Sequence, residues 1–266
     1  MIPDPPARAH RAEAVARSTA ILVAADPADR PNAGGAGIDR LLTAGDVVLV
    51  DARNRSAEEV RRALGAVTGP GPRSAPGWSV GVLGAAGDAL VAAVQGGATY
   101  VVDVGGAEPA DLAAVAQRDV VVVVGGNRSA GPEVRARGRD VTERHRAVLA
   151  QGGQAGAVVL EVPLGSGMSA PASQARRDGC PVGVVVEGPV HERRLDVTAT
   201  APGDVERGRE IALLTADLVA GVATVRTSDA QRARRVRAVV AWLVGSAGDG
   251  SVDLIDAVEG LGDVAP

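Results

Sequence analysis

Residues 79–106, SVGVLGAAGDALVAAVQGGATYVVDVGG, contain the unit that decides the fold. Two short runs rich in Val flank a helix-compatible stretch, Gly87 to Gln95, and Gly96 and Gly97 separate that stretch from the second run. Both runs lack the polar alternation of a strand with one wet face, so they suit strands buried on both faces of a parallel sheet. The segment therefore predicts a strand, a helix and a second parallel strand.

Runs of this kind occur eight times along the chain, with helix-compatible stretches between them. They are Ile21–Ala25, Val47–Asp51, Ser79–Leu83, Thr99–Val104, Val120–Val124, Ala157–Val162, Val182–Val186 and Val222–Arg226. Eight strand–helix pairs in about 250 residues match the α/β architecture of the (β/α)8 TIM barrel, whose sites lie at the C-terminal ends of the strands. We predict one barrel domain over residues 19–248, a flexible N-terminal arm at 1–18 and a C-terminal cap or tail at 249–266.

The composition of the chain limits the kinds of partner and the compartment that we expect for this barrel. The chain has 266 residues, 46% of them hydrophobic, no Phe and a net charge of −4. Its basic residues form no stripe, which argues against nucleic acid. The absence of an apolar run of ~18 residues argues against a membrane span. The single cysteine, Cys180, fits a reducing compartment and stands at a strand entry, so we expect a cytoplasmic protein in which Cys180 is structural.

The chain contains no lysine, since its 28 basic residues other than histidine are all arginine. Schiff-base aldolases, pyridoxal-phosphate enzymes and Walker-type phosphate sites need a lysine amine and are excluded. Arginine binds phosphate or carboxylate through two parallel hydrogen bonds, so anionic ligands remain possible.

Acidic residues fall at or near the ends of four predicted strands: Asp51, Asp103, Glu161 and Glu187. A barrel could direct them into one mouth, where they would bind a cationic or hydrogen-bond-donating heterocycle or act as general acids and bases. The alternative is that some are solvated loop acids or helix caps.

Other candidates surround the same predicted mouth. Asn127, Arg128 and Arg226 follow strands directly and could bind an anion. Weaker candidates are Asp29, Arg53, Arg55 and His191. The three histidines lack metal-ligand spacing, so no metal site is predicted.

Several segments resemble dihydropteroate synthase, the folate-pathway barrel enzyme that joins p-aminobenzoate to a dihydropterin pyrophosphate. AAVQGGATYVVDVGG at 92–106 is similar to the family's A-x-x-x-G-A-x-x-x-N-D-x-S-G stretch, and LEVPLG at 160–165 is similar to L-D-P-G-x-G. Asp51 stands at the family's D-x-G-G-E-S strand end, and Asp29 with Gly34-Gly35 resembles the D-S-F-S-D-G-G loop. Residues 221–242 resemble the closing strand and helix. The resemblance spans most of the barrel but is weak in each segment.

The departures from the family pattern fall where the family does its chemistry. The first-loop Asn, the third-strand Asp and the Asn of N-D become Ala25, Leu83 and Val102. The Asp of D-P-G becomes Glu161, one methylene longer. Glu187-Gly188-Pro189 replaces S-R-K, and Arg226 with Thr227, after a one-residue shift, represents the final R-x-H anion site.

Losing one partner of a buried polar contact costs ~1–3 kcal/mol, so three or more losses in one pocket would abolish ordinary pterin binding. The resemblance then implies a non-catalytic or regulatory subunit, without the family's Mg²⁺ or another cofactor. It would form a homodimer, or a heterodimer with a dihydropteroate-synthase-like paralogue, through outer helices at Val205–Val219 and Ala230–Val244. The alternative is a repurposed enzyme of specialised metabolism that acts on an aromatic or heterocyclic substrate, and a working dihydropteroate synthase is a third possibility.

Overall fold

The computed structural model describes residues 19–24, 46–68, 79–117, 120–125, 134–186 and 202–246, with only the backbone for 134–140, 202–206 and 244–246. The strands are β1 (Ala20–Ala24), β2 (Asp46–Asp51), β3 (Ser79–Leu83), β4 (Tyr100–Asp103), β5 (Val121–Val124), β6 (Val158–Pro163), β7 (Val182–Val185) and β8 (Thr224–Thr227). The helices are α3 (Ala57–Thr68), α4 (Asp88–Gln95), α5 (Pro109–Ala116), α6 (Val134–Ala150), α7 (Ala170–Arg177), α8 (Pro202–Val219) and α9 (Ala230–Ser246), with a 3-10 turn, η2 (Ala155–Ala157), before β6.

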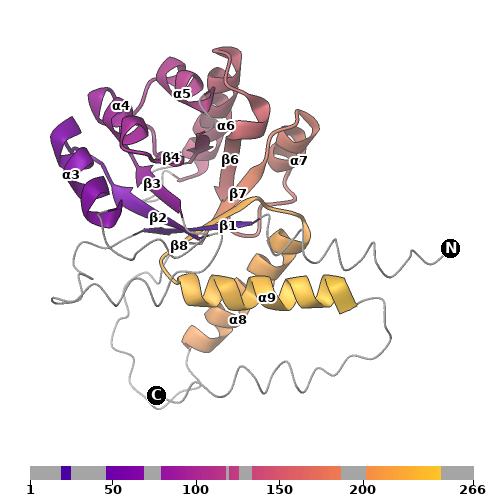
Figure 1. Cartoon of the computed structure of the whole chain (residues 1–266). Helices are drawn as coiled ribbons and strands as arrows, with labels where there is room; N and C mark the ends of the chain where they lie inside the picture. The colour runs from indigo at the N-terminus through magenta and orange to yellow at the C-terminus, as the bar shows by residue number, and fades with distance from the viewer. Residues whose placement is uncertain are drawn as a thin grey trace.

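The eight strands form one closed parallel barrel in sequence order, from β1 round to β8. Ile21 of β1 pairs with Asp46 of β2 on one side and with Val225 of β8 on the other, which closes the ring. Helices surround the barrel, with α8 and α9 lying below the strands in the view of Figure 1. The predicted (β/α)8 fold is confirmed, and each predicted strand agrees with the observed one to within one or two residues. The predicted arm and tail lie outside the described residues, so those boundaries stay predictions.

The barrel interior is filled with branched aliphatic side chains, as a chain without Phe requires. One buried cluster occupies it: Leu22, Val47, Leu49, Leu83, Val102, Val123 and Val159. Because side chains alternate along a strand, these residues fix which neighbours point inward. At Gly81 a Cβ atom would come 2.8 Å from Cβ of Tyr100, so this inward position has room only for glycine. The interior is a packed core, as is usual in barrels of this class.

Local signals place the helices around this core. Ser56 and Glu59 form a capping box at the start of α3, where the Ser56 amide donates to Glu59 Oε2 at 2.8 Å and the Glu59 amide donates to Ser56 Oγ at 3.3 Å. Cys180 is buried at the entry to β7, and its burial raises the pKa of the thiol. An inert, structural thiol is what such an environment produces.

Arginines of α9 connect this helix to the N-terminal side of the barrel. Arg234 pairs with the buried carboxylate of Asp46 at 2.5 Å, and Arg237 donates to the Thr19 carbonyl at 2.8 Å. Thr19 in turn donates its hydroxyl to the Val222 carbonyl. These contacts join α9 to the beginnings of β1, β2 and β8.

Within the part of the chain that the structure describes, no helix combines the length and hydropathy that a membrane crossing needs.

Candidate functional site

The C-terminal ends of the strands bring three candidate residues to the inward face of the barrel. Asp51 and Glu161 lie two residues beyond the inward-facing Leu49 and Val159, so they point the same way. Arg226 pairs in register with the inward-facing Leu22. We call the region around Asp51, Glu161 and Arg226 the mouth.

Glu161 and Arg226 form a two-pronged ion pair in the mouth. Arg226 donates from Nε to Glu161 Oε1 at 2.8 Å and from Nη2 to Glu161 Oε2 at 2.5 Å. The Glu161 side chain is 1% exposed and that of Arg226 is 16% exposed. Parallel N–H···O bonds between a guanidinium and a carboxylate are among the strongest and most directional contacts in proteins. The pair links β6 to β8 across β7.

Gly125, directly after β5, makes room for this pair. A Cβ atom at Gly125 would lie 2.2 Å from Glu161 Oε2, closer than any real contact. Since Arg226 holds the Glu161 carboxylate from the other side, the carboxylate can retreat only by giving up part of the ion pair.

Replacing Gly125 by Ala should therefore destabilise the protein by about 1–3 kcal/mol, the usual cost of adding a methyl group to a tightly packed site. Urea unfolding followed by circular dichroism measures the loss. Gly65→Ala is the control, because a Cβ at Gly65 meets nothing within 4 Å and lies inside helix α3. Equal stability of Gly125→Ala and the wild type would show that the carboxylate moves freely.

Asp51, at the end of β2, is held by its own neighbour. Arg53 donates from Nε to Oδ1 at 3.0 Å and from Nη2 to Oδ2 at 2.7 Å, and its backbone amide also donates to Oδ1 at 3.0 Å. The Arg53 side chain crosses Gly84, where a Cβ would come 2.4 Å from Arg53 Cγ. The Arg53 hydrogen bonds, aided by the charges of Arg53 and Arg55, hold the pKa of Asp51 below its usual value.

Removing the Arg53 guanidinium should raise the pKa of Asp51 towards the ordinary value of 3.8. In Arg53→Met, an NMR titration of the Asp51 carboxyl would show this shift, while Arg62→Met on the exposed face of α3 should leave Asp51 unchanged. Because the folded-state pKa is depressed, the stabilisation from this pair is present above pH ~4 and is lost as pH falls through the folded pKa. An unchanged Asp51 titration in Arg53→Met would contradict the assigned cause.

Asp103, at the end of β4, faces away from the mouth. Its neighbour Val102 belongs to the interior cluster, so alternation turns Asp103 outward to the helix layer. Its Oδ1 accepts hydrogen bonds from the backbone amides of Gly105, Gly106 and Ala107 at 3.1, 3.2 and 3.3 Å. Its Oδ2 accepts a hydrogen bond from the Arg144 side chain of α6. The binding role that the sequence suggests for Asp103 stays a prediction, but these contacts are those of a residue that holds the β4–α5 loop.

Two residues at the family's polar positions are apolar parts of the core. Leu83 is 7% exposed and Val102 is 0% exposed, and both pack inside the barrel. Neither side chain can accept or donate a hydrogen bond. On β3 and β4 the described mouth is therefore lined by aliphatic side chains, an apolar floor below the strand ends.

Of the remaining candidates, the structure describes only Arg55. Arg55 is half-buried, and its amide donates to the Ala52 carbonyl at 3.2 Å. The other candidates, together with Ala25, lie outside the described residues: Asp29, Asn127, Arg128, Glu187 and His191.

The described donor set does not fit the Mg²⁺ of the resembled family. The part of the chain that the structure describes contains no group of three or more His, Cys, Asp or Glu side chains that could hold a metal ion. The Asp51 carboxylate already accepts from Arg53, and Glu161 from Arg226.

Sequence reasoning missed Arg144 and Asp217, which position two strand-end loops. Asp217 of α8 is 2% exposed and accepts the amides of Gly165 and Gly167 at 2.6 and 2.8 Å. A single acid in the otherwise apolar stretch of α8 could have signalled a buried polar contact. Arg144 carried no such signal, because it is one of several charged residues in α6.

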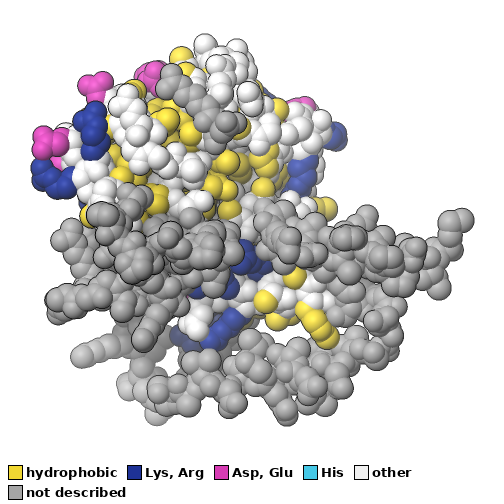
Figure 2. Space-filling model, in the orientation of Figure 1, with side chains coloured by type: hydrophobic (Ala, Val, Ile, Leu, Met, Phe, Trp, Pro, Cys, Tyr) yellow, Lys and Arg dark blue, Asp and Glu magenta, His cyan; other side chains and the backbone are white. Residues whose placement is uncertain are grey.

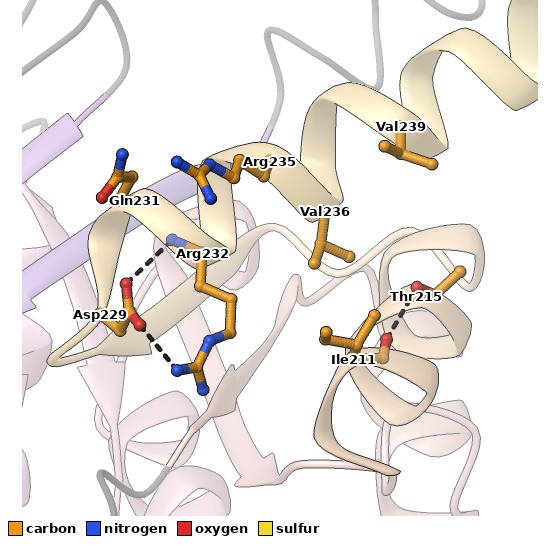
Figure 3. A pocket seen from close by; sticks show the side chains of 8 residues that line it. All are labelled: Ile211, Thr215, Asp229, Gln231, Arg232, Arg235, Val236 and Val239. Carbon is orange, nitrogen blue, oxygen red and sulfur yellow. Dashed lines mark hydrogen bonds and ion pairs between the residues drawn. The ribbon is translucent and has the colours of Figure 1, made fainter. Parts of the chain in front are cut away.

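A second candidate surface lies between α8 and α9, outside the barrel. This surface contains a pocket of about 420 Å³. In Figure 3, Val236 and Val239 of α9 lie above Ile211 and Thr215 of α8. Asp229 begins α9 by accepting the Arg232 amide, and Arg232 also pairs with Glu210 of α8 at 2.9 Å. In Figure 2 apolar and arginine side chains lie side by side in the lower part of the view, where α9 is drawn in Figure 1. Exposed apolar side chains continue along both helices: Ile211, Val219, Val239 and Leu243.

Together these features define a (β/α)8 barrel with a partly self-paired mouth, and comparison with solved structures identifies which barrels it is similar to. The Mycobacterium tuberculosis protein Rv1207 matches with a TM-score of 0.59 and 16% identity, over 85% of this chain and 93% of that one. Dihydropteroate synthase from Yersinia pestis with a pterine-sulfa conjugate matches with a TM-score of 0.55 and 15% identity, over 85% of this chain and 92% of that one. Dihydropteroate synthase from Xanthomonas albilineans in complex with 7,8-dihydropteroate matches with a TM-score of 0.53 and 19% identity, over 90% of this chain and 96% of that one.

The chain thus has a barrel fold like that of dihydropteroate synthase, and the resemblance suggested by its sequence is confirmed at the level of fold. At these identities the likeness defines the fold alone. No family model matches the sequence, and no curated protein matches it either.

Proposed function

We propose that this protein is a dihydropteroate-synthase-like barrel that serves as a non-catalytic or regulatory subunit of a dimeric cytoplasmic assembly. The observation that carries the proposal is the Glu161–Arg226 pair, which commits the carboxylate of β6 and the guanidinium of β8 to each other. A site for chemistry needs such groups directed at a substrate. Here they satisfy one another inside the chain.

The other described acids of the strand ends support the same conclusion. Asp51 is paired with Arg53, and Asp103 is fully buried among backbone amides and Arg144. Leu83 and Val102 supply an apolar floor where the resembled enzymes have Asp and Asn. No cofactor is part of this proposal, because these side chains supply no matching set of donors.

The partner surface we propose is the α8–α9 face. Its exposed apolar side chains and adjacent arginines have the composition of an interface core with a polar rim. The partner is a second copy of this chain or a dihydropteroate-synthase-like paralogue.

Two measurements test this function. Purified protein is incubated with p-aminobenzoate and dihydropterin pyrophosphate, and chromatography should detect no dihydropteroate above the level without protein. Light scattering should give a dimer mass, alone or after mixing with the paralogue, and Val239→Arg should halve that mass. Formation of dihydropteroate would overturn the non-catalytic assignment, and a monomer under both conditions would overturn the subunit role.

A repurposed enzyme is the second candidate, and the partial exposure of Asp51 favours it. The Asp51 side chain is 29% exposed at the inward end of β2, beside apolar Leu83, so it could meet the N–H groups of an aromatic heterocycle. Native mass spectrometry of protein from its own host would detect a retained heterocycle. Loss of that ligand in Asp51→Asn, with retention in Glu58→Gln, would support this alternative.

A further inference from the structure

The pocket between α8 and α9, which we call the α8–α9 groove, leaves apolar surface uncovered on the outside of the barrel. In the part of the chain that the structure describes, four of the six exposed large hydrophobic side chains belong to these two helices: Ile211, Val219, Val239 and Leu243. Ile211 and Val239 line the groove itself. Exposed apolar side chains gathered in this way mark a surface that another segment covers.

An exposed arginine lies beside this apolar surface. Helix α9 contains four arginines and no acidic residue. Arg234 and Arg237 contact the N-terminal side of the barrel. Arg232 is paired with acidic side chains of α8 and of the β8–α9 turn, whereas Arg235 is exposed at the rim of the groove. A segment that fits here should therefore combine aliphatic residues with acidic ones.

The tail predicted at residues 249–266 has this composition. It contains five acidic residues and no arginine: Asp249, Asp253, Asp256, Glu259 and Asp263. Leu254, Val258 and Leu261 are spaced by four and then three residues, which places them on one face of a helix. Most of the acids fall on the opposite face of such a helix, so the sequence of the tail is amphipathic.

We infer that residues 251–262 form a helix that docks into the α8–α9 groove of the same chain, antiparallel to α9. The groove side of α9 has the spacing of the tail in reverse, since Val236, Val239 and Leu243 are three and then four residues apart. Residues 247–250, which include two glycines, connect the helices and are of the length that joins antiparallel helix pairs.

A turn at residues 247–250 brings the two apolar faces into register. Each aliphatic residue of the tail then meets one of α9: Leu254 beside Leu243, Val258 beside Val239 and Leu261 beside Val236. Glu259, at the edge of the apolar face of the tail, lies within one turn of Arg235. The apolar groove is thereby covered by a helix whose outer face is acidic.

The covalent connection to α9 favours the tail over a separate protein as the occupant. A short flexible linker gives the attached segment an effective concentration of the order of millimolar, so even weak docking is populated. The inference goes beyond the proposed function, because a partner that uses the α8–α9 face must first displace the tail.

Disulfide trapping in the full-length protein tests this docking. Cys180 is buried and is the single native cysteine, so it does not compete. Val239→Cys/Val258→Cys should close a disulfide within one chain, because the two positions face each other. Val239→Cys/Ala257→Cys is the matched control, since position 257 turns away from α9 in the docked helix. Val91→Cys/Val258→Cys is a second control, with its first cysteine at an exposed position of α4.

Each protein is reduced, diluted and oxidised, and the disulfide is measured over time by non-reducing electrophoresis and intact mass. We expect the Val239→Cys/Val258→Cys pair to close at least about tenfold faster than Val239→Cys/Ala257→Cys, because a docked tail must undock before position 257 reaches α9. Adding Arg235→Glu should slow closure by about two- to fivefold, the usual effect of an exposed ion pair. Arg61→Glu, the same charge change on the exposed face of α3, should have no effect.

Equal rates at positions 257 and 258 would overturn the inference, since they describe a tail that only diffuses near α9. Closure of Val91→Cys/Val258→Cys at the same rate would overturn it as well. A disulfide between two chains would assign the groove to a second copy and exclude docking within the chain. These outcomes are separate from failure of the proposed function, which is read from dihydropteroate formation and dimer mass in the wild type.

Discussion

Replacing Arg226 by Met is expected to destabilise the protein by about 3–5 kcal/mol, the usual result of leaving one ion of a buried pair without its partner. The Glu161 carboxyl group would then stay in a site where its side chain is 1% exposed, with no guanidinium to accept from. Urea unfolding gives the free energy of unfolding, with the slope m as the check that the folded state is unchanged.

The double variant Glu161→Leu/Arg226→Met is the informative control. It removes both charges and fills the space with apolar atoms, so it should recover to within about 1 kcal/mol of the wild type or exceed it. Arg62→Met, which breaks an exposed pair on α3, should change stability by less than about 1 kcal/mol. A loss in the double variant as large as in Arg226→Met would mean that shape, and not the unpaired charge, sets the cost.

Replacing Asp103 by Ala is the second change with a large expected effect, a loss of about 3 kcal/mol or more. The carboxylate is fully buried and serves three backbone amides and Arg144, and each charge-assisted hydrogen bond contributes about 1.5–3 kcal/mol before relaxation. The β4–α5 loop should loosen first, because Gly105, Gly106 and Ala107 lose their acceptor.

Hydrogen exchange provides a local measurement of that loosening. Amides 105–107 should exchange faster in Asp103→Ala, whereas Asp111→Ala, at an exposed position in the first turn of α5, should leave them protected. Unchanged exchange at 105–107 would contradict the role assigned to Asp103.

The sequence predicted the barrel because strand and helix periods are local properties. Each run of Val, Leu and Ile is short, unbroken and followed by a helix-compatible stretch, and the Ser56–Glu59 spacing at the start of α3 is typical of a capping box. The sequence also found both partners of the Glu161–Arg226 pair, since each stands at a strand end. Their pairing was not predicted, because it depends on the register that sets β6 against β8 across β7.

Asp103 shows where the same reasoning fell short. It was grouped with the inward-facing acids because it ends a strand, although its apolar neighbour Val102 takes the inward position and alternation turns Asp103 outward. That distinction was available from the pattern. Its partner Arg144 was not, because nothing in a helix rich in charge marks the one residue that packs against a distant loop.

The bonds between α9 and the N-terminal side of the barrel determine when this protein can fold during synthesis. Arg234 meets Asp46 across 188 residues and Arg237 meets Thr19 across 218. The second neighbour of β1 is β8, so on the ribosome β1 lacks that neighbour until β8 has emerged, and an unpaired parallel strand edge is prone to wrong pairing. Contacts of such long range also slow folding. Closure of the ring is thus a late event, and nascent chains that stop before α9 should be the ones that chaperones retain.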